Sequence, residues 1–191
     1  MNAYDFDKTI YKNDSTADFY FFCIKKHPAL FFTLFNTLFC AIRYYIFKSG
    51  SKTQFKQRMY SFFKKIDAES LAEEFWEKHI DGIKKFYLKQ QREDDVIISA
   101  SPEFLLSPVC HKLKIKNLIA SKVDPKTGHY TGENCHGKEK VRRFYERFPE
   151  GRIDRFYSDS HSDDPLAEIA KESFMVKGES LSKWNEGHQC K

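Results

Sequence analysis

MNAYDFDKT, residues 1–9, places a short apolar run directly before two aspartates, Asp5 and Asp7. A run of this kind is typical of a short buried strand that ends in a polar loop. In open α/β sheets, ligands bind outside the carboxyl ends of the strands. The first nine residues therefore predict a strand of an α/β sheet, with two carboxylates at its ligand-binding end.

The composition indicates a folded globular protein. The 191 residues are enough for one domain, or for one domain with an insertion. Hydrophobic residues make up 41% of the chain, and 19 Phe and 10 Tyr supply a large core. The net charge of +5 is too small, and the basic residues are too dispersed, to indicate nucleic-acid binding. We therefore expect no nucleic-acid partner.

The cysteines and the amino-terminal acids bear on location and metals. The five cysteines include no CxxC pair, so a zinc site is not expected. Asp5 and Asp7 occupy the place that a signal peptide would need for its charged and apolar regions. We expect a cytoplasmic protein with reduced thiols.

Strand and helix patterns alternate over much of the chain. Further strands are expected at residues 96–100, 118–123, 152–159 and 173–178; the first of these is a β-branched run that ends at Pro102. Helical patterns occupy residues 102–113, 137–148 and 165–172, and residues 124–132 indicate a small hairpin around a glycine turn. This alternation predicts an α/β fold with a parallel sheet.

Residues 14–91 break the alternation, because they contain only aromatic-rich helical patterns. Asp14, Ser15 and Thr16 offer N-cap side chains for a first helix. Apolar residues at helical spacing continue from Ala68 to Leu88. We therefore expect an α/β core built from residues 1–13 and 92–191, with an all-helical insertion at residues 14–91.

One helix of this insertion carries few charges. Residues 29–47 include a single charged side chain, Arg43, and a helix of that length would span about 28 Å. A narrow stripe of polar residues favours a helix buried within the insertion. Two alternatives remain open, namely an interfacial helix that makes peripheral contact with a membrane and a full transmembrane span.

The acidic residues point to a divalent cation. Asp5 and Asp7 follow the first predicted strand, Ser99 lies at the end of the second, and Asp159 ends the fourth. If these strands are neighbours, their side chains meet at one edge of the sheet. Clustered carboxylates need a neutralising cation, and hard oxygen ligands favour Mg²⁺, which keeps waters for a phosphate substrate.

Four motifs follow one another along the chain: DFDKT at residues 5–9, IISAS at 97–101, GKEK at 137–140 and YSDSHSDD at 157–164. Together they resemble the haloacid dehalogenase superfamily, and most closely the branch that contains phosphoserine phosphatase. The resemblance covers nearly the whole chain. It implies a Rossmann-like parallel sheet core with an all-helical cap inserted after the first strand.

The resemblance also implies a Mg²⁺-dependent phosphatase that works through an aspartyl-phosphate intermediate. Asp5 would be the nucleophile and Asp7 the general acid and base. The ion would be held by Asp5, by the main-chain carbonyl of Asp7 and by Asp159. Ser99 would bind the phosphate, together with main-chain N–H groups around Ala100 and Ser101. Lys140 would neutralise charge, and Asp163 would orient either metal-bound water or Lys140. Thr9 would support the motif turn.

Two assignments have close competitors and two positions depart from the family pattern. Ser101 competes with Ser99, and Lys138 competes with Lys140; the end of the apolar run and the GxxK spacing favour Ser99 and Lys140. Position 8 is Lys where much of the superfamily has Gly. Position 158 is Ser where Gly commonly precedes the metal-binding Asp, and Ser fits there unless φ is positive.

The substrate stays open, because the cap sets specificity. A small metabolite resembling phosphoserine is one expectation. A lipid phosphate resembling phosphatidylglycerophosphate is the alternative, in keeping with the aromatic run within residues 29–47 and with a location on the inner face of a membrane. A phosphate-binding module without turnover and a phosphotransferase remain further alternatives.

Overall fold

The computed structural model describes residues 1–31 and 61–184 of the protein. One mixed sheet of six strands runs through it, in the order β3-β2-β1-β4-β5-β6. Its first five strands pair in parallel, and β6 is antiparallel to β5. The strands are β1 (Asn2–Tyr4), β2 (Val96–Pro102), β3 (Asn117–Ser121), β4 (Arg155–Ser158), β5 (Glu172–Lys177) and β6 (Ser180–Lys183).

The described helices fill the intervals between the strands. The α-helices are α1 (Ser15–Lys26), α4 (Ala68–His79), α5 (Lys85–Gln90), α6 (Glu103–Lys112), α7 (Lys138–Arg147) and α8 (Asp164–Ile169). Short 3-10 helices cover Pro28–Leu30, Ser61–Lys65, Ile80–Gly82 and His161–Asp163. The predicted α/β fold with a parallel sheet is confirmed.

Strand β1 lies at the centre of the sheet, between β2 and β4. Ala3 pairs with Val96 on one side and with Phe156 on the other. The chain passes from β1 to β2 and β3 in one direction and then to β4, β5 and β6 in the other. The order therefore reverses beside β1, and such a reversal is where open α/β sheets form their ligand crevice.

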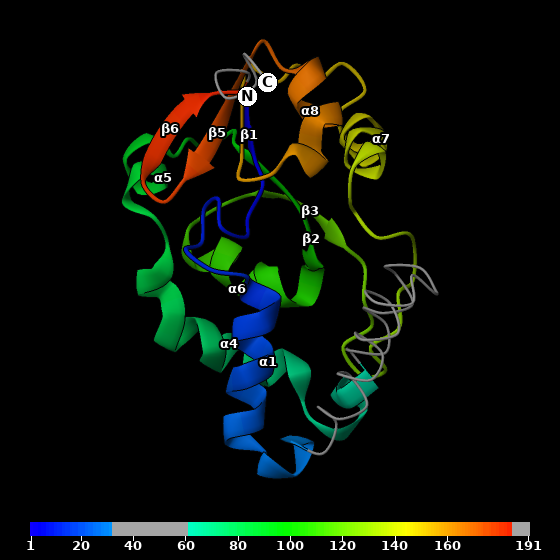
Figure 1. Cartoon of the computed structure of the whole chain (residues 1–191). Coiled ribbons are helices and arrows are strands. Elements are labelled where there is room, and N and C mark those ends of the chain that lie inside the picture. The colour runs from blue at the N-terminus through cyan, green and yellow to red at the C-terminus, as the bar shows by residue number, and fades with distance from the viewer. Residues whose placement is uncertain (32–60, 185–191) are drawn as a thin grey trace, which may run out of the picture.

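The sheet separates two hydrophobic clusters. Alternate side chains of a strand point to opposite faces. Tyr4 and Ile97 accordingly belong to the cluster that includes α6 residues, whereas Ala3 and Val96 pack in the cluster that includes α7 and α8 residues. Figure 1 shows α7 and α8 together beside the sheet, with α1, α4 and α6 gathered at the other end of the molecule.

Aromatic side chains extend the first cluster from the sheet into helices α1 and α4. Phe6 and Trp76 meet edge to face with ring centroids 5.7 Å apart, and Phe19 meets Phe75 at 5.6 Å. The indole N–H of Trp76 donates to the carbonyl oxygen of Leu105, 2.6 Å away, which joins α4 to α6. The described helices before β2 therefore share one continuous core with the sheet.

The helical spacing from Ala68 to Leu88 corresponds to two α-helices, α4 and α5, with a break between them. Helix α4 ends at His79, and Ile83 is extended and bridges Tyr11 in antiparallel fashion. The amide of Lys12 donates to the carbonyl of Gly82 at 2.9 Å. A Cβ atom at Gly82 would lie 2.4 Å from the Tyr11 ring, so only glycine allows this approach. Close pairing with residues 10–12 thus overrides the helical spacing.

Strand β6 was not predicted. Its sequence, SLSK, is short and exposed throughout, so it has no apolar alternation to detect. The missed signal is the two-residue turn Gly178-Glu179, in which Gly178 has φ +61° and Lys177 pairs with Ser180. The expected hairpin at residues 124–132 is present in a minimal form: an antiparallel bridge joins Val123 to Tyr130, and backbone hydrogen bonds from Asp124 to His129 (2.9 Å) and from Thr131 to Lys122 (3.0 Å) flank it.

The apolar helix predicted at residues 29–47 falls almost entirely outside the described residues. At its start, Pro28–Leu30 form a 3-10 turn. Within residues 1–31 and 61–184, no helix combines the length and apolar character that crossing a bilayer requires.

Candidate active site

Asp5 stands at the carboxyl end of the central strand. Its amide still donates to the carbonyl of Tyr157 on β4, at 2.9 Å, so the backbone of Asp5 is fixed to the neighbouring strand. The residue is 8% exposed. Burial, assisted by the charges of Asp163 and Asp7 and opposed by Lys140, raises the pKa of Asp5 to about 7. A carboxylate in this position needs positive charge nearby.

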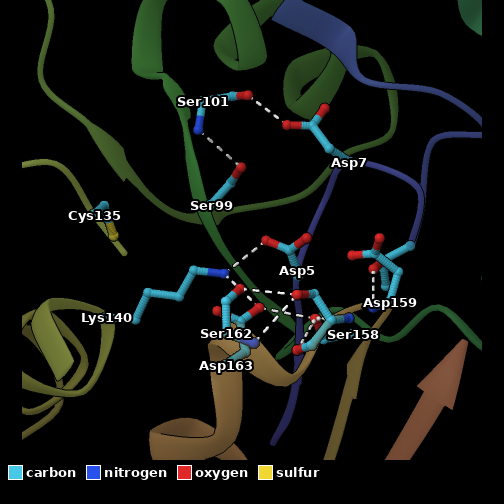
Figure 2. A network of polar contacts seen from close by, with 12 residues as sticks. Asp5, Asp7, Ser99, Ser101, Cys135, Lys140, Ser158, Asp159, Ser162 and Asp163 are labelled. Atoms are coloured by element: carbon cyan, nitrogen blue, oxygen red, sulfur yellow. Dashed lines mark hydrogen bonds and ion pairs between the residues drawn. The ribbon is translucent and has the colours of Figure 1, made fainter. Parts of the chain in front are cut away.

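Lys140 supplies that charge. Its ammonium lies 2.7 Å from Asp5 Oδ1 and 2.8 Å from Asp163 Oδ2, and the side chain is 2% exposed (Figure 2). Burial alone would lower the pKa of this lysine, but the two carboxylates raise it above its ordinary value, so Lys140 stays charged. The competing Lys138 is exposed. The GxxK spacing thus selects the lysine that reaches Asp5.

Asp163 holds Lys140 from the other side. Its Oδ2 also accepts a hydrogen bond from the Ser158 hydroxyl at 2.8 Å. Its Oδ1 is buried without a hydrogen-bond partner among the described residues. Buried acceptors are usually satisfied, so this oxygen is suited to a donor such as an ordered water.

Asp7 points away from Lys140 toward the start of helix α1. Its Oδ1 accepts from the amide of Ser15 at 2.7 Å, and its Oδ2 accepts from the Ser101 hydroxyl. The same hydroxyl lies 3.0 Å from the Thr16 hydroxyl. Burial, with the charge of Asp14 as the next contribution, raises the pKa of Asp7. The carboxyl group of Asp7 therefore holds a proton more readily than the carboxyl group of an exposed aspartate does.

The two competing serines occupy different positions. Ser99 is 1% exposed, and its hydroxyl oxygen accepts the amide of Ser101 at 3.1 Å. Ser101 instead turns its hydroxyl to Asp7 (Figure 2). Ala100 lies between them on β2. The structure thus brings both serines to the site but directs only the Ser101 hydroxyl to a catalytic candidate.

Asp159 follows directly after β4 and faces the first motif. Its amide donates to the Thr9 hydroxyl oxygen at 3.0 Å, and Thr9 is fully buried. Thr9 therefore ties the first motif to the residue after β4. Burial raises the pKa of Asp159, although the charge of Lys8 opposes the shift.

The two departures from the family pattern differ in their effect. Lys8 has φ +57°, in the left-handed region that glycine adopts most easily, so a side chain there carries a conformational cost. Ser158 is an extended residue of β4 and is absent from the positive-φ residues of the described chain. Position 158 therefore meets the condition under which Ser can replace Gly.

The donor set suits a hard divalent cation. Asp5 and Asp159 are carboxylates at adjacent strand ends, and the Asp7 carbonyl lies at the same edge. All are oxygen donors, as Mg²⁺ prefers. Within residues 1–31 and 61–184, no cluster of three His, Cys, Asp or Glu side chains suits a metal. The predicted set needs only two side chains. Burial is the largest cause of the raised pKa of both carboxylates, and a cation bound between them would favour their charged forms.

Several contacts of the site were not predicted. Ser158 was considered only as a departure, yet its hydroxyl holds Asp163. Ser15 was predicted only as a capping residue, yet its amide holds Asp7. Lys84 donates to the carbonyl of Lys8. The Ser158 contact was detectable from its place within the fourth motif, whereas nothing in the sequence distinguishes Lys84 from other lysines.

Comparisons with known proteins agree with this architecture. The histidinol-phosphatase of Neisseria meningitidis serogroup C (strain 8013) is 27% identical over 114 residues, 51% of this chain and 51% of that protein. The match thus spans about half the length of that curated relative. A protein of unknown function from Bordetella pertussis Tohama I has a TM-score of 0.70 at 20% identity, covering 91% of this chain and 87% of the other.

A phosphoserine phosphohydrolase-like protein from Francisella tularensis subsp. tularensis SCHU S4 has a TM-score of 0.53 at 17% identity, over 91% of this chain and 86% of that chain. At these identities the structural likeness concerns the fold. The family model of the haloacid dehalogenase-like hydrolases matches residues 3–168, from the first strand through α8, and so spans all four motifs. The chain therefore belongs to the haloacid dehalogenase-like hydrolase family.

Proposed function

We propose that the protein is a Mg²⁺-dependent phosphomonoester hydrolase with Asp5 as its nucleophile. One observation carries the proposal: a buried aspartate at the switch point of the sheet is paired with a buried lysine, and two further aspartates lie at the same edge. Family membership supports it, as do the names of two relatives, a histidinol-phosphatase and a phosphoserine phosphohydrolase-like protein.

In the first step, a carboxylate oxygen of Asp5 attacks phosphorus while the ester P–O bond breaks. Lys140 holds Oδ1, and no residue of the described chain donates to Oδ2, so Oδ2 is the attacking oxygen. The product is an aspartyl phosphate on Asp5, and the alkoxide leaves with a proton from Asp7. The raised pKa of Asp7 suits this acid role.

In the second step, water attacks the aspartyl phosphate. Asp7, now a carboxylate, accepts the proton of that water, and the acyl-phosphate P–O bond breaks. Inorganic phosphate is released, and Asp5 and Asp7 return to their starting states. Throughout both steps Lys140 neutralises charge on Asp5 and the phosphoryl oxygens, and Asp163 keeps the lysine in place.

The phosphoryl group would be bound by the Ser99 hydroxyl and by the amides near Ala100 and Ser101. Mg²⁺ would be held by Asp5, by the Asp7 carbonyl and by Asp159. Bound there, the ion neutralises phosphate charge, so that an anionic nucleophile can approach. The unpartnered Asp163 Oδ1 is suited to orient water beside this site.

We infer that residues 1–13 and 92–191 form the catalytic core and that residues 14–91 form a cap that closes on the substrate. A small soluble phosphomonoester is the favoured substrate class. A lipid phosphate is the second candidate, because Phe21 and Phe31 are exposed by 57% and 51% near the basic end of α1. Co-sedimentation with anionic liposomes separates the two, since a small-metabolite phosphatase has no reason to bind vesicles.

The test of the function is hydrolysis of p-nitrophenyl phosphate with Mg²⁺. We expect Asp5→Asn to lower turnover by about a thousandfold or more, because it removes the nucleophile. Asp81→Asn is the matched control, since Asp81 is an exposed residue away from the motifs. Wild-type turnover in Asp5→Asn would disprove the nucleophile. A wild type that binds phosphate without hydrolysing any of a broad ester panel would be a binding module.

A further inference from the structure

Lys84 is a second buried lysine beside the motif, and the proposed reaction does not use it. It is 6% exposed. Its ammonium donates a hydrogen bond to the main-chain carbonyl of Lys8, the residue that follows Asp7. Burying an ammonium costs several kcal/mol unless it is matched by acceptors and opposite charge, so the contact calls for an explanation.

The main chain of Lys84 is fixed against the segment that follows the motif. Its amide donates to the carbonyl of Ile10 at 2.8 Å, and Ile83 bridges Tyr11. The side chain then reaches back to position 8. A residue that lies after the helical segment therefore contacts the motif that lies before it, 76 positions away.

The turn that Lys84 contacts has an unfavourable backbone conformation. Lys8 has φ +57°, in the left-handed region that is unfavourable for a residue with a side chain. The amide of Lys8 is held by the carbonyl of Asn13 at 2.9 Å. Its carbonyl is held by Lys84 through a charge-assisted hydrogen bond, which is stronger than a neutral one. Both the amide and the carbonyl of Lys8 are thus restrained by hydrogen bonds.

The charges of two carboxylates favour the ammonium form of Lys84. Burial lowers its pKa, but the charges of Asp159 and Glu179 oppose that shift. Glu179 is itself held in place, because its carboxylate accepts the amides of Lys85 and Phe86 at 3.1 and 3.0 Å. The pKa of Lys84 is nevertheless lowered, because the effect of burial exceeds that of the two charges.

We propose that Lys84 is a positioning residue for the reaction: it clamps the turn at Lys8 and so sets the place of Asp7. The inference rests on the proposed function, because the place of Asp7 affects the rate only if Asp7 is the acid and base of that reaction. A small displacement of such a group lowers the rate without loss of binding. Lys84 itself touches no reacting atom.

The test compares Lys84→Met with Lys85→Met, which changes the adjacent exposed lysine. We expect Lys84→Met to lower kcat for p-nitrophenyl phosphate by about tenfold to a hundredfold while KM changes less than about threefold. Lys84→Arg, which keeps the charge and the donors, should restore part of kcat. In native-state hydrogen exchange, the amides of Ile10 and Tyr11, both bonded to the carbonyl of Phe6, should exchange at least about tenfold faster in Lys84→Met.

The proposal requires that Lys84→Met changes both kcat and the amide exchange rates. If Lys84→Met matches Lys85→Met in kcat or in exchange, the assignment is overturned while the hydrolase function stands. If the wild type hydrolyses no ester, the proposed function fails, and unchanged exchange would then also refute the clamp. If Lys84→Met does not fold, Lys84→Gln takes its place, with an intermediate loss of kcat and intermediate exchange expected.

Discussion

Replacing Lys140 by Met should destabilise the protein strongly and in a pH-dependent way. Met fills nearly the same volume but removes the ammonium that lies 2.7 Å from Asp5 and 2.8 Å from Asp163. Because both carboxylates are buried, they lose their common counter-charge without gaining water. Removing one partner of a buried ion pair costs about 3–5 kcal/mol of unfolding free energy, and we expect that range at pH 8.

The loss should shrink as the pH falls. Without Lys140, the pKa of Asp5, already raised to about 7, has one opposing influence fewer. The folded variant then binds more protons than its unfolded chain between about pH 4 and the raised pKa, so its stability declines as pH rises through that window. Well below the raised pKa the Asp5 carboxyl of the variant is neutral, so most of the penalty at Asp5 disappears.

Urea unfolding at pH 8 and pH 5 measures both effects, with Lys138→Met as the control. Lys138 is exposed two positions away, and its replacement should change the unfolding free energy by less than about 0.5 kcal/mol. If Lys140→Met is as stable as Lys138→Met at pH 8, or if its loss is equal at both pH values, then the ion pairs do not have the energetic role described.

Two further predictions concern buried groups at opposite ends of the sheet. Burial raises the pKa of Asp95 from 3.8 to about 6, so its contribution to stability is present below about pH 3.8 and is lost as pH rises through 6. The free energy of unfolding of Asp95→Asn, relative to that of the wild type, should therefore increase by up to about 3 kcal/mol between pH 4 and pH 8. Parallel pH profiles of the two proteins in urea unfolding would refute this. Thr9→Val leaves the half-buried Asp159 amide without its acceptor and should cost about 1 kcal/mol of unfolding free energy. It should also raise the Mg²⁺ concentration needed for half-maximal activity, and an unchanged Mg²⁺ dependence would count against Asp159 as a ligand.

The parallel core was predictable because each strand carries its own signal. VIISA is a continuous β-branched run, as a strand covered on both faces requires. Strand β6 carries no such signal, because SLSK lies exposed at the sheet edge and depends on pairing with β5. The break after His79 was hidden for a related reason. It is caused by contact between Gly82 and Tyr11, and residues so distant leave no local pattern.

The site shows the same division. Asp5, Lys140 and Asp163 come together because each lies at a strand end or in the first turn of a helix, positions that motif order indicates. The partners of Asp7 depend on how α1 enters the fold, and Ser15 and Ser101 are 86 positions apart. Only three-dimensional packing reveals which serine contacts the acid.

The pairing of residues 10–12 with residues 82–84 has a consequence for the segment between them. Lys12 donates to Gly82, and Lys84 donates to Ile10, so residues 13–81 leave and return at one point. Closing a long loop costs only slightly more free energy than closing a shorter one. The entropy of closure therefore leaves the length of this segment open to change, whereas the packing of Trp76 against Phe6 and Leu105 restricts which side chains its helices can carry.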